Sequence, residues 1–171
     1  LFSSATVLLS NGSGGLSVVN YAMPDRTKAV VSGDFDEDGT VDLAFSVENT
    51  GVVAFYNVTG TGDFSNAANR ATYTANTPAG LAVGDVNKDG FLDILGVSPL
   101  SASSSVTVSY GMSGRGFDRV EIAAPGINPT QVAFGDIDGD GANELVVASS
   151  PSRQVAVFKE LKEDRKSTRL N

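Results

Sequence analysis

Acidic side chains that could together hold a hard metal ion recur in three short stretches of the chain. The first reads Gly-Asp-Phe-Asp-Glu-Asp-Gly-Thr-Val-Asp-Leu over residues 33–43, and closely similar stretches cover residues 84–94 and 135–145. Their leading aspartates, Asp34, Asp85 and Asp136, follow one another at equal intervals of 51 residues. Carboxylates at alternate positions of a tight loop can direct several oxygens at one centre, and calcium takes about six to eight oxygen ligands. The spacing therefore predicts three calcium loops built on one repeat.

The expected ligands in each loop, counted from the leading aspartate, are the side chains at positions 1, 3, 5 and 9 and the backbone carbonyl at position 7. They are Asp34, Asp36, Asp38, Thr40 and Asp42 in the first loop, Asp85, Asn87, Asp89, Phe91 and Asp93 in the second, and Asp136, Asp138, Asp140, Ala142 and Glu144 in the third. A glycine at position 6 supplies the sharp turn, because a positive φ is cheap only without a Cβ. The alternative is an acidic turn without metal, in which the carboxylates would repel one another without compensation.

The segments beside the loops are typical of strands. An EF-hand loop begins in a similar way, but it needs a glutamate at position 12 and a helix on each side. Position 12 is Phe45, Gly96 or Val147 here, and no side chain of these can bind a metal. Residues 41–47, 92–97 and 144–148 are short, apolar and rich in β-branched side chains, which predicts strands. Each loop is therefore expected to join two strands.

The triplicated loop resembles the FG-GAP and VCBS repeats that form the blades of integrin-α-like β-propellers. A second motif, Gly-x-Gly-x-[Phe/Leu], supports the resemblance at residues 60–64 and, with small changes, at 12–16 and 114–117. The resemblance covers about residues 1–163. It implies an all-β fold, a partial β-propeller of four-stranded antiparallel blades with a calcium loop between strands 1 and 2 of each blade. It also implies that further blades of the same chain complete the ring, about seven in all.

The repeat divides the chain into units. Residues 1–28 are expected to end a preceding blade, 29–79 to form a blade with calcium loop 34–42, 80–130 a blade with loop 85–93, and 131–163 a truncated blade with loop 136–144. The expected strands cover 29–32, 43–47, 52–56 and 70–74 in the first full unit, and 81–83, 92–97, 106–110 and 120–123 in the second. Residues 164–171 change composition abruptly and resemble a translated sequencing adapter, so we exclude them from the fold; a natural basic tail is the alternative.

Composition excludes several classes of function. The chain has no Cys and no His, which removes thiol and histidine catalysis, disulfides and zinc–thiolate sites. Its formal net charge is −8, and it becomes −10 without the net +2 of residues 164–171. An acidic surface of this kind disfavours nucleic acid as a partner. No apolar run approaches the length of a membrane span. Recurring phenylalanines such as Phe35 and Phe134 are expected in the core rather than in a ligand-binding platform.

The predicted calcium loops also indicate where in or outside the cell the protein is located. Cytosolic calcium is scarce, whereas weakly binding loops work at the millimolar calcium found outside cells, so we expect an extracellular or cell-surface protein. The expected role is a binding or adhesion scaffold for a protein or carbohydrate ligand. The alternative is an accessory propeller of a larger secreted enzyme. Catalysis by this chain is not expected, because an enzyme needs one special site, whereas the repeat presents the same acids three times.

Overall fold

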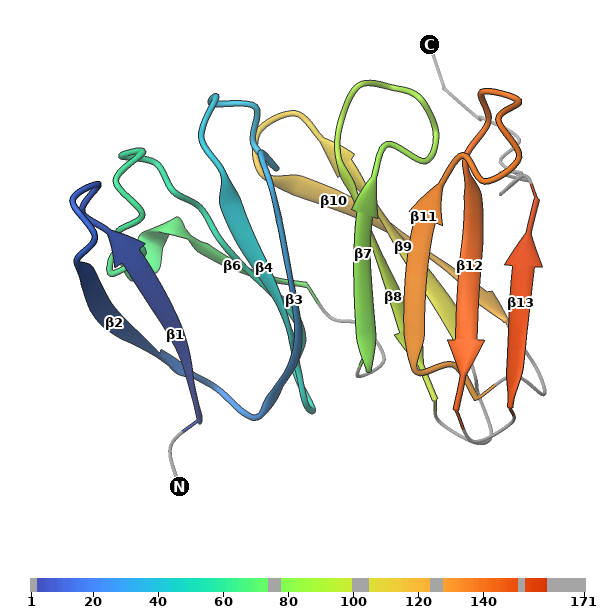
Figure 1. Ribbon diagram of the computed structural model, residues 1–171, viewed down its shortest axis with the longest axis horizontal. Coiled ribbons are helices and arrows are strands. Elements are labelled where there is room, and N and C mark those ends of the chain that lie inside the picture. The colour runs from blue at the N-terminus through green and yellow to red at the C-terminus, as the bar shows by residue number, and fades with distance from the viewer. Residues whose placement is uncertain (1–2, 74–77, 100–104, 124–127, 151–152, 160–171) are drawn as a thin grey trace, which may run out of the picture.

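The computed structural model describes residues 3–73, 78–99, 105–123, 128–150 and 153–159. Within these residues the chain forms antiparallel strands, with one short 3₁₀ turn, η1 (Ala67–Asn69). Figure 1 shows the strands gathered into successive sheets along the longest axis of the molecule. No helix among the described residues is long and apolar enough to cross a membrane.

Each sheet takes its strands in sequence order. An N-terminal hairpin joins β1 (Ser3–Ser10) to β2 (Leu16–Met23). The first sheet contains β3 (Thr27–Gly33), β4 (Asp42–Val47), β5 (Gly51–Phe55) and β6 (Arg70–Tyr73). The second sheet contains β7 (Gly80–Gly84), β8 (Asp93–Ser98), β9 (Ser105–Met112) and β10 (Gly116–Ala123). The third sheet contains β11 (Gln131–Gly135), β12 (Glu144–Ser149) and β13 (Gln154–Phe158).

The strand boundaries differ from the expected ones chiefly at hairpins. β10 begins at Gly116 rather than at residue 120, because β9 and β10 stay paired up to their turn, where Gly116 lies opposite Met112. β3 begins at Thr27, two residues before the expected start of its unit. β5 ends at Phe55 and not at residue 56. The predicted end of the fourth strand at Thr74, and the excluded residues 164–171, lie outside the described residues.

The sheets stack face to face, and the alternation of side chains along the strands explains why. Along β4, Phe45 faces the N-terminal hairpin, whereas its neighbour Ala44 faces the second sheet. Along β8, Ile94 faces the first sheet and Leu95 faces the third. Because both faces of each four-stranded sheet are covered, the residues of the central strands are buried almost throughout, and in β9 they include Ser105, Thr107 and Ser109.

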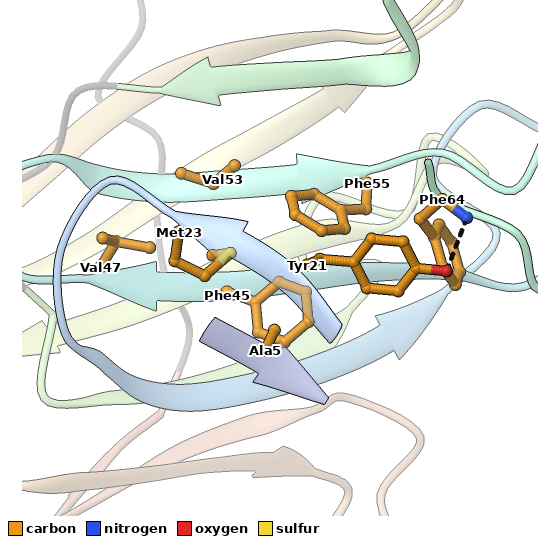
Figure 2. Close-up of a cluster of buried hydrophobic side chains, with 8 residues drawn as sticks. All are labelled: Ala5, Tyr21, Met23, Phe45, Val47, Val53, Phe55 and Phe64. Carbon is orange, nitrogen blue, oxygen red and sulfur yellow. Dashed lines mark hydrogen bonds between the residues drawn. The ribbon is translucent and has the colours of Figure 1, made fainter. Parts of the chain in front are cut away.

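The contact between the hairpin and the first sheet is rich in aromatic side chains (Figure 2). The Tyr21 ring meets Phe55 and Phe64 edge to face, at centroid distances of 5.8 and 5.9 Å. The Tyr21 hydroxyl also accepts a hydrogen bond of 3.1 Å from the Phe64 backbone N–H. Phe64, the last residue of the Gly-x-Gly-x-Phe motif, therefore anchors the β5–β6 connection to the neighbouring hairpin. Burial of these rings confirms that they belong to the core.

The three acidic stretches are the loops β3–β4, β7–β8 and β11–β12, and they emerge at the same end of the stack (Figure 1). The first strands of successive sheets are neighbours, with β7 in contact with both β3 and β11. The fold is therefore all-β and built from antiparallel sheets of up to four strands, as predicted. The number of blades and the closure of a ring stay predictions.

Candidate metal centre

The three acidic loops share one backbone conformation. Gly39, Gly90 and Gly141 at position 6 all have left-handed φ angles, of 86°, 95° and 85°. Position 4 is left-handed as well, with a φ of 59° at Glu37 and 61° at Lys88. Sequence reasoning anticipated the turn at position 6 and missed the one at position 4. A signal was present in the third loop, where position 4 is itself a glycine, Gly139, with a φ of 78°.

The carboxylate at position 1 closes each loop on its own backbone. Asp34 accepts hydrogen bonds from the N–H groups of Asp38, at 3.1 Å, and Gly39, at 2.9 Å. Asp85 has the same two contacts at the same distances in the second loop. Asp136 accepts from Gly139 and Gly141 in the third loop, at 2.7 and 3.0 Å. These bonds curl the chain so that later side chains return toward position 1.

Position 9 is the first residue of the second strand in each sheet, and its carboxylate is buried. Asp42 has no exposed surface, and its two oxygens accept hydrogen bonds from the backbone of Phe35, at 2.9 Å, and Asn57, at 2.7 Å. Phe35 is position 2 of the same loop, whereas Asn57 lies just after β5. The Asp42 side chain therefore ties the loop to the third strand of its sheet. Burial is the main cause that raises the pKa of Asp42, against the lowering effect of both hydrogen bonds.

The same arrangement recurs in the second loop, and its bond to position 2 recurs in the third. Asp93 is fully buried and accepts from the N–H groups of Val86, at 2.7 Å, and Gly111, at 2.8 Å. Burial again raises its pKa. Glu144 is 3% exposed and accepts from Ile137 at 2.9 Å. Position 9 was predicted only as a ligand; the structure adds that it organises the loop, a role that the spacing of acids did not reveal.

Position 5 is turned toward position 7. One oxygen of Asp38 accepts from the Thr40 N–H at 2.9 Å and from the Thr40 hydroxyl at 2.6 Å, and this hydroxyl bond is the main cause that lowers the pKa of Asp38. Asp89 accepts from the Phe91 N–H at 2.9 Å, and Asp140 from the Ala142 N–H at 2.8 Å. In each loop the position 5 carboxylate is therefore bonded to the N–H of the residue whose carbonyl is the predicted position 7 ligand.

Two of the loops gather three carboxylates at one point. Oxygens of Asp34, Asp36 and Asp42 lie within 4.8 Å of one another, and so do oxygens of Asp136, Asp138 and Glu144. These are positions 1, 3 and 9 in both loops. In the second loop position 3 is Asn87, so positions 1, 3 and 9 carry two carboxylates and one amide. An all-oxygen, strongly anionic set of this kind fits a hard divalent cation such as calcium.

Basic side chains reach the loops from outside them. Arg115, in the turn between β9 and β10, places its Nε 2.7 Å from Oδ2 of Asp36. Lys159, which follows β13, places its Nζ 2.7 Å from Oδ2 of Asp138. The Arg115 and Lys159 side chains therefore each contact the carboxylate at position 3 of a loop. Sequence reasoning missed both, because no spacing connects Arg115 to an acid 79 residues away.

Comparison with known proteins gives one family match. Residues 34–96 match the family described as "FG-GAP-like repeat". The matched segment begins at the leading aspartate of the first loop and runs through the second loop into β8. No curated protein matches the chain.

Proposed function

Since residues 34–96 of this chain match the FG-GAP-like repeat, we propose that the chain is a calcium-binding β-propeller module of a secreted or cell-surface protein. In this proposal calcium has a structural role, and the module serves as a binding or adhesion scaffold for a protein or carbohydrate ligand. Further blades of the same type complete the propeller.

The observation that carries the calcium proposal is the convergence of carboxylates at positions 1, 3 and 9. Two loops place three carboxylate oxygens within 4.8 Å of one another, a density of negative charge that a divalent cation would compensate. The side chains that would hold the ion are those at positions 1, 3, 5 and 9, with the position 7 carbonyl. A bound calcium ion would supply charge neutralisation and cross-linking of the loop.

The chain's own residues explain why such cross-linking would matter. Asp42 already joins the first loop to the end of β5 through its bonds to Phe35 and Asn57. An ion held by Asp34, Asp36 and Asp42 would fix the outer part of the loop to this buried carboxylate. Loop, second strand and third strand would then move as one unit.

The proposed role as a scaffold is supported by the repetition of the acidic set. Three similar loops at one end of the stack offer no single special site for chemistry, and the described residues contain no His or Cys. An accessory propeller of a larger secreted enzyme is the second candidate. The sequence of the neighbouring domains separates the two, because a catalytic domain beside the propeller favours the accessory role.

Calorimetric titration with calcium tests the metal proposal. The wild-type chain should bind three ions, with dissociation constants of about 10⁻⁵ to 10⁻³ M. Asp38→Ala, Asp89→Ala and Asp140→Ala should each remove one ion, and the loop with Asn87 should be the weakest because it has one carboxylate fewer. Asp63→Ala is the matched control, since Asp63 is an exposed turn acid outside the loops. A stoichiometry unaffected by all three loop changes would refute calcium binding.

A further inference from the structure

Arg115 connects the second sheet to the acidic loop of the first sheet. Its Nε lies 2.7 Å from Oδ2 of Asp36, and its guanidinium carbon lies 4.7 Å from the centroid of the Tyr56 ring. The Asp36 side chain is 5% exposed and that of Arg115 is 34% exposed. The Asp36 end of the ion pair is therefore largely withdrawn from water, unlike an ordinary surface pair, whereas the Arg115 end is partly exposed.

The backbone of Arg115 is held as firmly as its side chain. Its carbonyl accepts a hydrogen bond of 2.8 Å from the Tyr73 hydroxyl, which in turn lies 2.8 Å from the Tyr56 hydroxyl; the Tyr56 oxygen is 3.5 Å from the same carbonyl. Arg115 also has a left-handed φ of 68°, a conformation that is uncommon for a non-glycine residue. Two tyrosines of the first sheet thus position a turn of the second.

The carboxylate that Arg115 contacts is one of the three that converge in the first loop, together with Asp34 and Asp42. We propose that Arg115 is a competitor for this loop: it neutralises Asp36 in the metal-free protein, lowers the calcium affinity of loop 34–42, and is loosened when calcium binds. This inference rests on the proposed calcium binding and adds a residue that sets its strength. It also makes the contact between the first and second sheets sensitive to calcium.

The sign of the effect follows from charge. Four carboxylates at positions 1, 3, 5 and 9 attract the guanidinium, and a bound calcium ion would cancel two of their four charges. Arg115 is therefore held more strongly without the ion than with it. Because coupling between two ligands of one site is reciprocal, Arg115 must oppose calcium to the same extent that calcium opposes Arg115. Even in a water-like dielectric, a unit charge and a double charge on the order of 6 Å apart repel enough to change affinity about tenfold.

Lys159 provides a matched comparison at the third loop. It contacts Asp138, also at position 3, over the same 2.7 Å. Its side chain is 69% exposed and that of Asp138 is 39% exposed, so solvent screens this pair far more. Lys159 comes from the same sheet as its loop, whereas Arg115 comes from the neighbouring sheet. A competitor effect should therefore be large at the first loop and small at the third.

The test is a calcium titration of the full chain followed by amide NMR. Gly39, Gly90 and Gly141 report the three loops separately, because each N–H donates to the leading aspartate of its own loop. Arg115→Gln should tighten the calcium dissociation constant seen at Gly39 about tenfold and leave the other two within about twofold. Arg115→Lys, which keeps the charge, should stay close to wild type. Lys159→Gln should tighten the constant at Gly141 by less than about threefold.

A measurement on the wild type covers the case in which Arg115→Gln fails to fold. The Arg115 Nε–H signal should shift and exchange faster with water as calcium is added, with the same midpoint as Gly39. An unchanged Nε–H signal, or an equal or weaker calcium constant at Gly39 in Arg115→Gln, overturns the inference while calcium binding stands. If none of the three glycines responds to calcium in the wild type, the proposed function itself fails, and the inference fails with it.

Discussion

Replacing Asp42 by alanine should destabilise the protein even when no calcium is present. The change removes the acceptor of two buried backbone N–H groups, those of Phe35 and Asn57. A buried donor left without a partner costs about 1–3 kcal/mol, so the pair amounts to about 2–6 kcal/mol. Domains of this size are stable by only about 5–15 kcal/mol, so the loss would be a large part of the total.

One effect works in the opposite direction. Burial raises the pKa of Asp42, which shows that the charged carboxylate is less well solvated there than in the unfolded chain. Alanine removes that desolvation cost, and the expected loss of stability therefore falls in the lower half of the range, about 2–4 kcal/mol. The two lost hydrogen bonds still outweigh the gain, because neither N–H can turn to water in a fully buried position.

Urea unfolding in the presence of a calcium chelator, followed by far-ultraviolet circular dichroism, measures this loss. Asp38→Ala is the control within the same loop. The Asp38 side chain is exposed and, among the described residues, accepts hydrogen bonds from Thr40 alone, so its removal should cost less than about 1 kcal/mol without calcium. Equal unfolding midpoints for the two variants would refute the organising role that we assign to position 9.

Further predictions concern pH, association and the C-terminus. Burial raises the pKa of Asp42 and Asp93 above the ordinary value of 3.8, so in the window above 3.8 the folded chain binds more protons than the unfolded chain. The contribution of these two groups to the stability of the calcium-free protein should therefore grow as pH falls from neutral into that window and shrink as pH rises. In urea titrations, the double variant Asp42→Asn/Asp93→Asn should lack this dependence of stability on pH. Val18 and Val155, which are 60% and 69% exposed on the outer faces of the N-terminal hairpin and the third sheet, should promote self-association. Sedimentation should detect it, Val155→Asp should reduce it, and a monomeric wild type would contradict it. Deleting residues 164–171 should leave calcium binding and the melting curve unchanged, whereas a clear loss of either would show that the tail belongs to the protein.

The sequence by itself was sufficient to predict the local structure of this protein, namely its repeated loops, its strands and its turn glycines. The equal spacing of Asp34, Asp85 and Asp136 identified one structural unit repeated along the chain, and alternating apolar segments located the strands to within a few residues. Both signals are short-range, because a tight loop and a strand depend mainly on the conformational preferences of residues next to one another. The position 6 glycines belong to the same class, since a left-handed φ is a property of one residue.

Only the tertiary structure decided which partners the acids meet. Asp42 bonds to the backbone beyond the next strand, and Asp36 bonds to Arg115 of the neighbouring sheet, 79 residues away. Neither contact has a pattern in the sequence, because the stacking of separate sheets brings the groups together. For the same reason the sequence alone did not distinguish position 9 from the other predicted ligands of the loop. Burial between packed strands makes it the residue that organises the loop, and burial is a property of the assembled sheets and not of the segment that carries the aspartate.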